Sequence, residues 1–553
     1  MKLIFYIANT AFQILNRKRY VEFKKSIENP EEAQLKVLQS IINSNKDCEI
    51  GKKFSFRKIN SAYDFQQLVP LMNYDDYEPF IRRIMAGEKN ILCSEEIDYL
   101  ALSSGTSTPS KYIPYTKTLK KQFNTTLNAW IYDLLKDNPK IKNGSQFWII
   151  TPLTTIDQKD SKIPVGFEPD SSYFGVIEKW LINCIMAIPE KIINVKDREN
   201  YFYLLCYFLL QKRNLRLISI WNPSLLISIT DFLKSNFSVL LNDMIHGTLS
   251  LPNPDVKSDY ELFRKKIRKN RKRANELIYA MENGSLNIKK IWPNLELISC
   301  WTESWARIYI SDIQEIFPGV KIQGKGLLST EAVITIPVSE APYPVLSVNT
   351  HFYEFKNIAD EKIYLAHELE INNEYEVYIT TGGGLYRYSL NDIVRVKGFY
   401  KKTPMLEFIG KKDKVSDFTG EKVNEEHVRQ IIDVLSNRYF EIGGLVFLGI
   451  QKYHNTFAYV LYIQKDKLRN QADFNRILND LDRLLCENFH YKNSRQMKQL
   501  AAPGLVIMEM EDKEKYLEFK SKKEVKSTFK LSVLETDFEL LSEVSKTIIW
   551  KNE

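Results

Sequence analysis

The sequence predicts an α/β protein with a large amino-terminal domain and a small carboxyl-terminal α+β lobe. Its 553 residues exceed what one hydrophobic core normally supports, so two or more domains are expected. Short apolar runs typical of strands alternate with helical patterns along much of the chain, which is typical of α/β architecture. After about Lys412 the pattern changes to a hairpin, an amphipathic helix and one more strand.

Residues 1 to about 95 are predicted to be mainly helical. The first seven residues resemble the start of a secretion signal. Polar residues then interrupt the apolar stretch and no small-residue cleavage site follows, so an amphipathic helix is expected. A further helix is predicted where apolar residues recur at helical spacing, at Leu119, Phe123, Leu127, Ile131 and Leu134. We expect a hydroxyl-rich loop near residue 105 to lead into this helix, which places the positive helix end near the loop.

Seven short runs read as strands of the larger domain. They are residues 147–151, 215–220, 295–299, 320–323, 332–336, 375–381 and 393–396. The most apolar run, residues 201–210, is about half of the roughly 20 residues that cross a bilayer, so it is expected to be a buried helix. The interpretation therefore includes no membrane partner.

The small lobe is predicted from a compact group of patterns. Residues 445–451 and 457–464 read as two strands joined by a turn at His454 and Asn455, and residues 474–485 as an amphipathic helix. A strand at residues 504–508 follows. We therefore divide the chain into residues 1–411 and 412–553, with the polar, lysine-rich stretch 410–414 as the hinge.

The charge balance favours a small anionic partner over a nucleic acid. Lys and Arg total 77 against 69 Asp and Glu, a net charge of +8 that is mild for this length. A basic run extends from Phe263 to Arg273. It has no aromatic residues interleaved among its basic ones to stack on bases, so we interpret it as the solvated face of a surface helix. No nucleic-acid partner is expected.

The cysteines and histidines predict neither disulfides nor a zinc site. The six cysteines are scattered singly and no Cys-x-x-Cys pair occurs, while the six histidines have no metal-ligand spacing. A reducing, cytoplasmic location fits this pattern.

The most informative stretch follows the apolar residues 99–102. It combines hydroxyls, a glycine and a lysine, at Ser103, Ser104, Gly105, Thr106, Ser107 and Lys111. Such a segment can turn several backbone N–H groups toward a polyphosphate, although it lacks the Walker spacing. Taken alone, a stretch of this composition is more often an ordinary loop.

Three later motifs favour the phosphate interpretation. Ser329-Thr330-Glu331 follows an apolar approach, and Tyr386 opens a Tyr-Arg-Tyr segment that ends at Asp392. A basic segment with Lys411 then leads to Lys422. In this order the motifs resemble the adenylate-forming superfamily. In detail they resemble the auxin-responsive Gretchen Hagen family of acyl acid amido synthetases. The matching stretches are SSGTSTPSKYIP from Ser103, CWTESWARIYI from Cys300, KGLLSTEAVITIP from Lys325, TTGGGLYRYSLND from Thr380 and GKKDKVSDFTGEKVNEE from Gly410, with VPLMNYDDYEPFIRRIMAGE from Val69 and WNPS from Trp221.

The resemblance implies an ATP- and Mg²⁺-dependent ligase that forms an acyl-AMP and transfers the acyl group to an amino acid or another amine. It implies that the hydroxyl loop holds phosphates and that Glu331 holds Mg²⁺. Ser329 and Thr330 then contact the α-phosphate or the acid, and Asp392 accepts from the ribose hydroxyls. The implied nucleotide site also contains Tyr386, Lys411 and Lys422, and the implied catalytic lysine of the small lobe is Lys530, which has several lysines for neighbours.

Two residues depart from the family pattern. Asn391 stands where glycine is more usual, and Lys411 stands where arginine is more usual. Lysine keeps the charge but loses the planar fork that makes a bidentate contact.

Two alternatives stay open at the level of sequence. The acyl group could pass to coenzyme A after the same first step, or the chain could be an inactive relative that only binds a ligand. The partners expected are a small carboxylic acid and an amine. The acid is expected beside the helix that carries Phe123, Leu127 and Trp130, which equally read as ordinary core.

Overall fold

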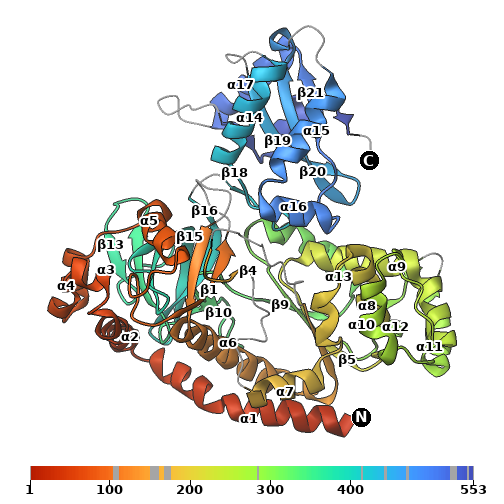
Figure 1. Ribbon diagram of the computed structural model, residues 1–553, viewed down its shortest axis with the longest axis horizontal. Coiled ribbons are helices and arrows are strands. Elements are labelled where there is room, and N and C mark those ends of the chain that lie inside the picture. The colour runs from red at the N-terminus through yellow and green to blue at the C-terminus, as the bar shows by residue number, and fades with distance from the viewer. Residues whose placement is uncertain are drawn as a thin grey trace. The chain divides into compact units, whose positions relative to one another are not determined.

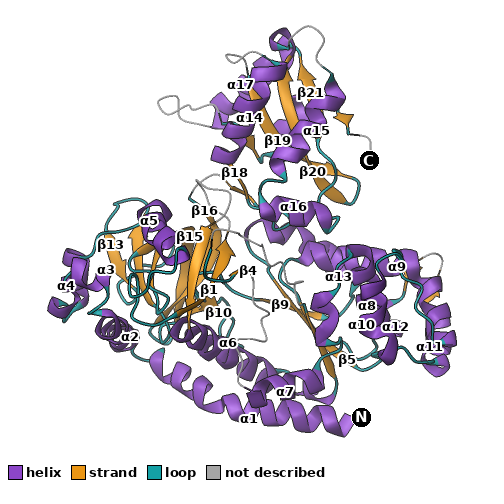
Figure 2. Cartoon of the chain, viewed as in Figure 1, coloured by secondary structure: helices purple, strands orange, loops and turns teal. Residues whose placement is uncertain are grey.

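The computed structural model describes residues 2–103, 111–149, 161–166, 176–282, 285–412, 415–440, 445–468, 473–523, 532–544 and 547–551. The chain forms two compact units, one of Met1–Ser103 with Tyr112–Lys412 and one of Asp413–Glu553 together with Lys111 (Figures 1 and 2). The predicted division between residues 411 and 412 lies one residue away. The mobility that we expect of the second unit stays a prediction.

Helices dominate the amino-terminal segment, as predicted. They are α1 (Lys2–Ser26), α2 (Pro30–Asn45), α3 (Glu49–Lys53), α4 (Ala62–Leu68) and α5 (Tyr74–Met85). Helix α1 is amphipathic in the sense predicted, because Phe12 and Phe23 are buried while Leu3 and Ile14 are exposed. Asn73 and Ser61 open α5 and α4 with capping boxes, which satisfy the first free N–H groups of each helix.

The largest sheet of the first unit has seven antiparallel strands. Their order is β10 (Thr335–Ile336), β11 (Val345–Leu346), β16 (Thr403–Lys411), β15 (Tyr388–Tyr400), β14 (Glu374–Thr380), β12 (Phe352–Asn357) and β13 (Ile363–Leu365). Two predicted strands differ from this. Residues 332–334 precede β10 without joining its sheet, and Val333 forms an isolated bridge with Leu328. Strand β15 begins at Tyr388, so Asp392 lies inside a strand and not at its start.

A second, parallel sheet lies between helices of the same unit (Figure 2). Its strands run in sequence order, β3 (Ser145–Trp148), β5 (Leu215–Ser219), β8 (Leu297–Cys300) and β9 (Lys321–Gly324). The segments between them contain α7 (Val176–Ile185), α8 (Arg198–Leu210), α9 (Pro223–His246), α10 (Lys257–Phe263), α11 (Arg271–Ile278), α12 (Ile288–Ile291) and α13 (Ile310–Ile316). The four strands confirm predicted ones, and α8 is buried as expected.

The hydroxyl-rich loop joins two neighbouring strands, which corrects the predicted connection. Strands β1 (Ile97–Ser103), β2 (Lys111–Thr116) and β4 (Val165–Gly166) form a sheet in the order β2-β1-β4, and only after β2 does α6 (Lys117–Asp137) begin. Strand β2 was not predicted because it is short and contains Pro114, so its residues could be read as part of the loop. The loop therefore does not lead directly into the helix.

Two segments bear on membrane and nucleic-acid binding. Among the described helices, α9 alone is long and apolar enough to cross a bilayer, and it packs against α8 and α11. The basic run does not form one surface helix. It covers the end of α10, a short 3-10 turn at Arg264–Lys266 and the start of α11, where Arg273 is buried and donates to the carbonyl of Leu210.

The second unit is built on a mixed five-stranded sheet. Its order is β22 (Leu534–Glu535), β19 (Val446–Tyr453), β20 (Thr456–Gln464), β21 (Gly504–Met508) and β23 (Ile549–Trp550). The other elements are β17 (Val415–Ser416), β18 (Val423–Asn424), α14 (Glu425–Tyr439), α15 (Phe474–Leu485), α16 (Phe489–Gln496), α17 (Met510–Lys523) and α18 (Phe538–Val544). The predicted hairpin, helix and last strand are all confirmed.

Candidate active site

Asp392 and Lys411 form an ion pair across two neighbouring strands of the large sheet. Asp392 on β15 lies opposite Lys411 on β16, and the lysine Nζ is 2.5 Å from the carboxylate Oδ1. The aspartate is 2% exposed, whereas the lysine side chain keeps 32% of its surface. Asn391 has φ of +57°, a conformation that glycine adopts without strain and asparagine tolerates. Asparagine at position 391, in place of the usual glycine, is therefore compatible with this backbone conformation.

The Ser-Thr-Glu motif forms a tight turn that buries its carboxylate. The Ser329 hydroxyl accepts from the backbone N–H groups of Glu331 and Ala332, at 3.2 and 3.1 Å. The hydroxyl of Tyr115 donates to the carbonyl of Thr330 at 2.6 Å. Glu331 is 6% exposed, and among the described residues its carboxylate has neither a hydrogen bond nor an ion pair. The turn thus holds a buried acid ready for a partner.

Tyr388 connects the two carboxylate positions. It opens β15 and is 1% exposed. Burial raises the pKa of its hydroxyl well above the ordinary value, and the negative charges of Glu331 and Asp392 raise that pKa further. Both carboxylates therefore act on the same tyrosine. The structure brings together two motifs that are about sixty residues apart in the sequence.

The strands beside the hydroxyl loop lie next to the same turn. Ser103 ends β1 and Lys111 begins β2, while the predicted residues Ser104, Gly105, Thr106 and Ser107 lie outside the described residues. Further along β2, Tyr115 makes the hydrogen bond to the Thr330 carbonyl. The loop and the Ser-Thr-Glu turn are therefore joined through β2.

The amino end of α6 does not offer a phosphate site, which corrects the sequence interpretation. Thr116 caps the helix by accepting from Leu119 N–H. The Glu95 carboxylate accepts from the backbone N–H of Thr118 at 2.9 Å and from its hydroxyl at 2.8 Å. A side-chain carboxylate already occupies the position where the helix dipole favours an anion.

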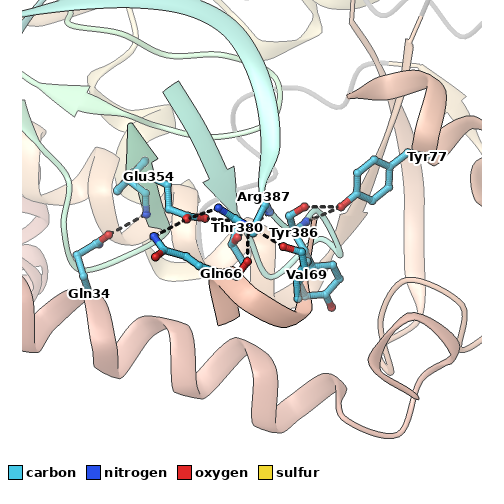
Figure 3. A network of polar contacts seen from close by, with 9 residues as sticks. Gln34, Gln66, Val69, Tyr77, Glu354, Thr380, Tyr386 and Arg387 are labelled. Carbon is cyan, nitrogen blue, oxygen red and sulfur yellow. Dashed lines mark hydrogen bonds and ion pairs between the residues drawn. The ribbon is translucent and has the colours of Figure 1, made fainter. Parts of the chain in front are cut away.

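Tyr386 belongs to the core, and we remove it from the predicted nucleotide contacts. Its side chain is fully buried and its hydroxyl donates to the carbonyl of Leu92 at 2.9 Å. Its ring packs edge-on against Phe56, and its backbone exchanges two hydrogen bonds with the Tyr77 hydroxyl (Figure 3).

The neighbouring Arg387 has a structural role. Figure 3 shows its guanidinium bonded to Glu354, with Nε and Nη2 each 2.9 Å from a carboxylate oxygen. The same group donates to the carbonyls of Gln66 and Val69. Arg387 also has φ of +45°, which is unusual for a residue with a Cβ. The buried pair holds the segment after α4 against the large sheet.

The last residue of the first unit is also anchored. The Lys412 Nζ lies 2.9 Å from Oε2 of Glu376, a buried acid on β14, and its backbone N–H donates to the Asn391 carbonyl at 2.7 Å. The chain thus leaves the large sheet directly beside the Asp392 strand. Glu376 was missed from the sequence because a glutamate inside a strand carries no motif.

The second unit contains the remaining predicted residues. Lys422 has φ of +45° and its carbonyl accepts from the Asn488 side chain at 3.0 Å. Lys530 lies outside the described residues. The Glu425 carboxylate accepts from Ser532 Oγ at 2.5 Å and from Val533 N–H at 3.0 Å. Glu425 therefore anchors the chain at Ser532 and Val533, shortly after the position of Lys530 in the sequence.

A cluster at the end of the parallel sheet was missed from the sequence. Lys325 is 2% exposed and its Nζ lies 2.6 Å from Ser219 Oγ. The rings of Trp130, Trp148 and Trp221 surround this ammonium group. The signal that could have revealed this cluster is a tryptophan at or just after the end of each of several strands.

Metal ligands are sparse in the described part of the chain. No group of three or more His, Cys, Asp or Glu side chains there could enclose a metal ion. Mg²⁺ commonly takes only one or two carboxylates and completes its shell with phosphate oxygens and water. The single buried Glu331 fits such a site.

Comparison with known families decides where this arrangement belongs. Residues 19–322 match the model of the GH3 family N-terminal domain, and residues 344–411 match the GH3 family central domain. The chain belongs to the GH3 family. Among curated relatives, indole-3-acetic acid-amido synthetase GH3.2 of Arabidopsis thaliana is 25% identical over 480 residues, which are 79% of this chain and 84% of that protein. GH3.3 of the same plant is 26% identical over 458 residues, 77% of this chain and 75% of that protein.

Solved structures give this GH3-family protein the adenylate-forming fold. GH3.15 acyl acid amido synthetase aligns with a TM-score of 0.63 at 18% identity, covering 96% of each chain. The same enzyme in complex with 2,4-DB gives 0.65, covering 97% of this chain and 98% of that one. A 2-hydroxyisobutyryl-CoA ligase gives 0.51 at 11% identity, covering 93% of this chain and 90% of that one.

Proposed function

We propose that this protein is an ATP-dependent acyl acid amido synthetase, which activates a carboxylic acid as acyl-AMP and transfers the acyl group to an amino acid or another amine. Its named relatives in the GH3 family are amido synthetases, which supports an acid–amino acid ligase. The structural observation that carries the proposal is Glu331, a buried carboxylate without a partner among the described residues.

We assign ATP to the hydroxyl loop and to Asp392. The hydroxyl loop from Ser103, with Lys111, is the proposed phosphate cradle. Asp392 is the proposed acceptor for the ribose hydroxyls, and Lys411 forms an ion pair with this carboxylate at 2.5 Å. A hydrogen bond to a charged group is worth about 1.5–3 kcal/mol, so one aspartate accounts for a large part of nucleoside recognition.

Glu331 is the proposed Mg²⁺ ligand. Glu331 would hold the ion, and an ion bound there would supply positive charge that lowers the repulsion between ATP and an approaching carboxylate. The turn fixes the backbone of Ser329 and Thr330 beside that position, so their hydroxyls are the proposed contacts for the α-phosphate and the acid.

The reaction then takes two steps. A carboxylate oxygen of the acid attacks the α-phosphorus of ATP, the bond to the β-phosphate oxygen breaks, and pyrophosphate leaves. The amine nitrogen next attacks the acyl carbon, the bond to the AMP oxygen breaks, and the amine gives up a proton. Oriented positive groups are needed in the first step because two anions meet. Lys530 is the proposed catalytic lysine of the second unit, and Lys422 lies in the segment after the proposed hinge.

Acid-dependent exchange of labelled pyrophosphate into ATP tests the first step. A panel containing indole-3-acetate, benzoate, terephthalate and para-methylbenzoate is offered with ATP and Mg²⁺. We expect exchange with at least one acid, followed by an amide when amino acids are added. No exchange with any acid would contradict the proposal, and a thioester formed with coenzyme A in place of an amide would favour the ligase alternative.

Glu331→Gln tests the metal assignment within the same assay. Glutamine keeps the size of the side chain and removes the charge that would hold Mg²⁺. We expect adenylation to fall by about tenfold or more, with partial recovery at high Mg²⁺. A wild-type rate with wild-type Mg²⁺ dependence would exclude Glu331 as a ligand.

A further inference from the structure

Helix α1 turns an apolar face away from the protein. The helix packs against α6 and α7 at the border of the first unit (Figure 1). Phe12 and Phe23 are buried on its inner side. By contrast, Leu3, Ile7 and Ile14 are 69%, 57% and 65% exposed. Scattered exposed apolar residues are ordinary, but a group of them on one face marks a site of interaction.

The spacing of these residues places them on one stripe of the helix. Leu3, Ile7 and Ile14 are separated by four and seven residues, which brings side chains to the same side of an α-helix. Lys18 and Lys25 continue the stripe at the same intervals, so its first part is apolar and its last part is basic. Helix α7, which packs against α1, adds further exposed apolar side chains. We call this group the α1–α7 face, and its apolar members are Leu3, Ile4, Ile7, Ile14, Ile177 and Trp180.

The charge along the basic part of this face is positive. Arg17, Lys18 and Lys25 are exposed, and Glu22 is the one acidic residue of α1. The Lys18 Nζ lies 3.9 Å from the Glu22 carboxylate, but the lysine side chain is 86% exposed, so water and salt weaken this pair. An excess of positive charge therefore lies beside the apolar stripe.

We propose that the α1–α7 face binds the surface of an anionic lipid bilayer. Apolar side chains on one side of a helix enter the boundary between headgroups and acyl chains, and a tryptophan such as Trp180 favours that depth. Exposed lysine and arginine beside them attract anionic headgroups. The sequence interpretation, which considered only segments that could span a bilayer, did not include a partner of this kind.

A contact between two copies of this chain suits the face less well. In a two-fold dimer the same surface meets itself. The exposed basic residues of α1 would then meet a partner helix whose one acidic residue is Glu22. The phosphates of anionic lipids pair with these basic residues without that mismatch.

Sedimentation of the full chain with lipid vesicles tests the proposal. Vesicles of phosphatidylglycerol and phosphatidylcholine in equal amounts are compared with vesicles of phosphatidylcholine alone. We expect the protein to bind the anionic vesicles at least about tenfold more tightly at low salt, and the difference to shrink as salt screens the basic residues. No binding to either vesicle, or equal binding to both, would overturn the proposal.

Matched variants locate the contact on the molecule. Ile14→Gln removes apolar surface from the face, and we expect it to weaken binding to anionic vesicles by about tenfold. Its control is Val239→Gln, because Val239 is 44% exposed on another helix, α9. Lys18→Gln should weaken binding and lessen its salt dependence, whereas Lys265→Gln, in the exposed basic run, should change neither. Loss of binding in the Val239 or Lys265 variant alone would place the lipid contact elsewhere and overturn the proposal.

Trp180 provides a local readout that does not need catalysis. Lipids brominated in their acyl chains should quench the fluorescence of the wild type more than that of Trp180→Phe, a variant that keeps an apolar ring. Equal quenching of the two proteins would contradict insertion of this face. Sedimentation velocity without lipid addresses the alternative. A dimer that Ile14→Gln dissociates, together with no vesicle binding, would identify the face as a contact between copies and overturn the proposal.

Discussion

Asp392 shows how one buried side chain is prepared for a polar ligand. Strand pairing sets its position, Lys411 pairs with its carboxylate and Asn391 supplies the unusual backbone angle beside it. The side chain is 2% exposed, so it can be altered only by a substitution that keeps its shape.

Asp392→Asn is therefore the informative change. We expect it to weaken ATP binding by roughly ten- to a hundredfold, which corresponds to about 1.5–3 kcal/mol. Titration calorimetry with ATP measures this directly. Asp360→Asn is a suitable control, because Asp360 lies at an exposed turn and bonds to Tyr364. Equal ATP affinity in the wild type and the Asp392 variant would remove Asp392 from the nucleotide site.

Glu303 gives the folded protein a predictable pH dependence. Burial, opposed by a hydrogen bond from Phe408 N–H, raises the pKa of this carboxyl from 4.5 to about 7. Between these values the folded state binds more protons than the unfolded state, so stability falls as the pH rises through this window.

The Glu303→Gln variant tests this sign. Between pH 5 and 8, the free energy of unfolding should fall by about 2–3 kcal/mol less in this variant than in the wild type, because glutamine does not ionise. Urea unfolding at several pH values provides the measurement. Identical pH profiles in the two proteins would show that Glu303 is not the group responsible.

At the scale of elements, the Glu354–Arg387 pair joins β12 to the segment that leads into β15 and to the chain after α4. Removing one partner of a buried pair leaves an uncompensated charge. We expect Glu354→Ala to lower the free energy of unfolding by about 3–5 kcal/mol.

The exposed pair between Asp137 and Lys321 provides the comparison. Asp137→Ala should stay within about 1 kcal/mol of the wild type, as surface pairs usually do. Denaturant unfolding gives both values. A Glu354 variant as stable as the Asp137 variant would mean that the network in Figure 3 contributes little to the fold.

Most of these elements could be predicted because their signals are local. Apolar runs such as residues 215–220 and the helical spacing from Leu119 to Leu134 correspond to β5 and α6. Strand β2 was missed, since its six residues contain a proline and follow a hydroxyl-rich loop.

The site was predicted only in part, because a sequence reveals local motifs but not contacts between distant residues. Asp392, Glu331 and Tyr386 all lie in recognisable motifs. Tyr386, however, is buried in the core. Lys325 and its tryptophans come from strand ends scattered over the chain, and only the parallel sheet brings them together. Pairing across a sheet depends on partners far apart in sequence, which no short pattern records.

At the scale of the whole molecule, the division after Lys412 separates Asp392 and Glu331 from Lys422 and Lys530. One site must carry out adenylation and then amine attack, and rotation of a small lobe about a short hinge is an economical solution. Asp413→Pro fixes a backbone angle at the proposed hinge and restricts Lys412.

We expect this variant to change the two half-reactions unequally. Single-turnover formation of acyl-AMP reports the first, and amine-dependent decay of preformed acyl-AMP reports the second. Equal effects of Asp413→Pro on both half-reactions, or none, would argue against a hinge at this position.

The central claim is that a carboxylate is activated on the α-phosphate of ATP and then captured by an amine. The most direct measurement uses an acid that supports exchange, with both carboxylate oxygens labelled with a heavy isotope, incubated with ATP, Mg²⁺ and an amino acid. Mass spectrometry of the products then follows the label. The account predicts one heavy oxygen in AMP, the other in the amide, and unlabelled pyrophosphate. Label in inorganic phosphate together with ADP, or AMP that carries no label, would contradict it.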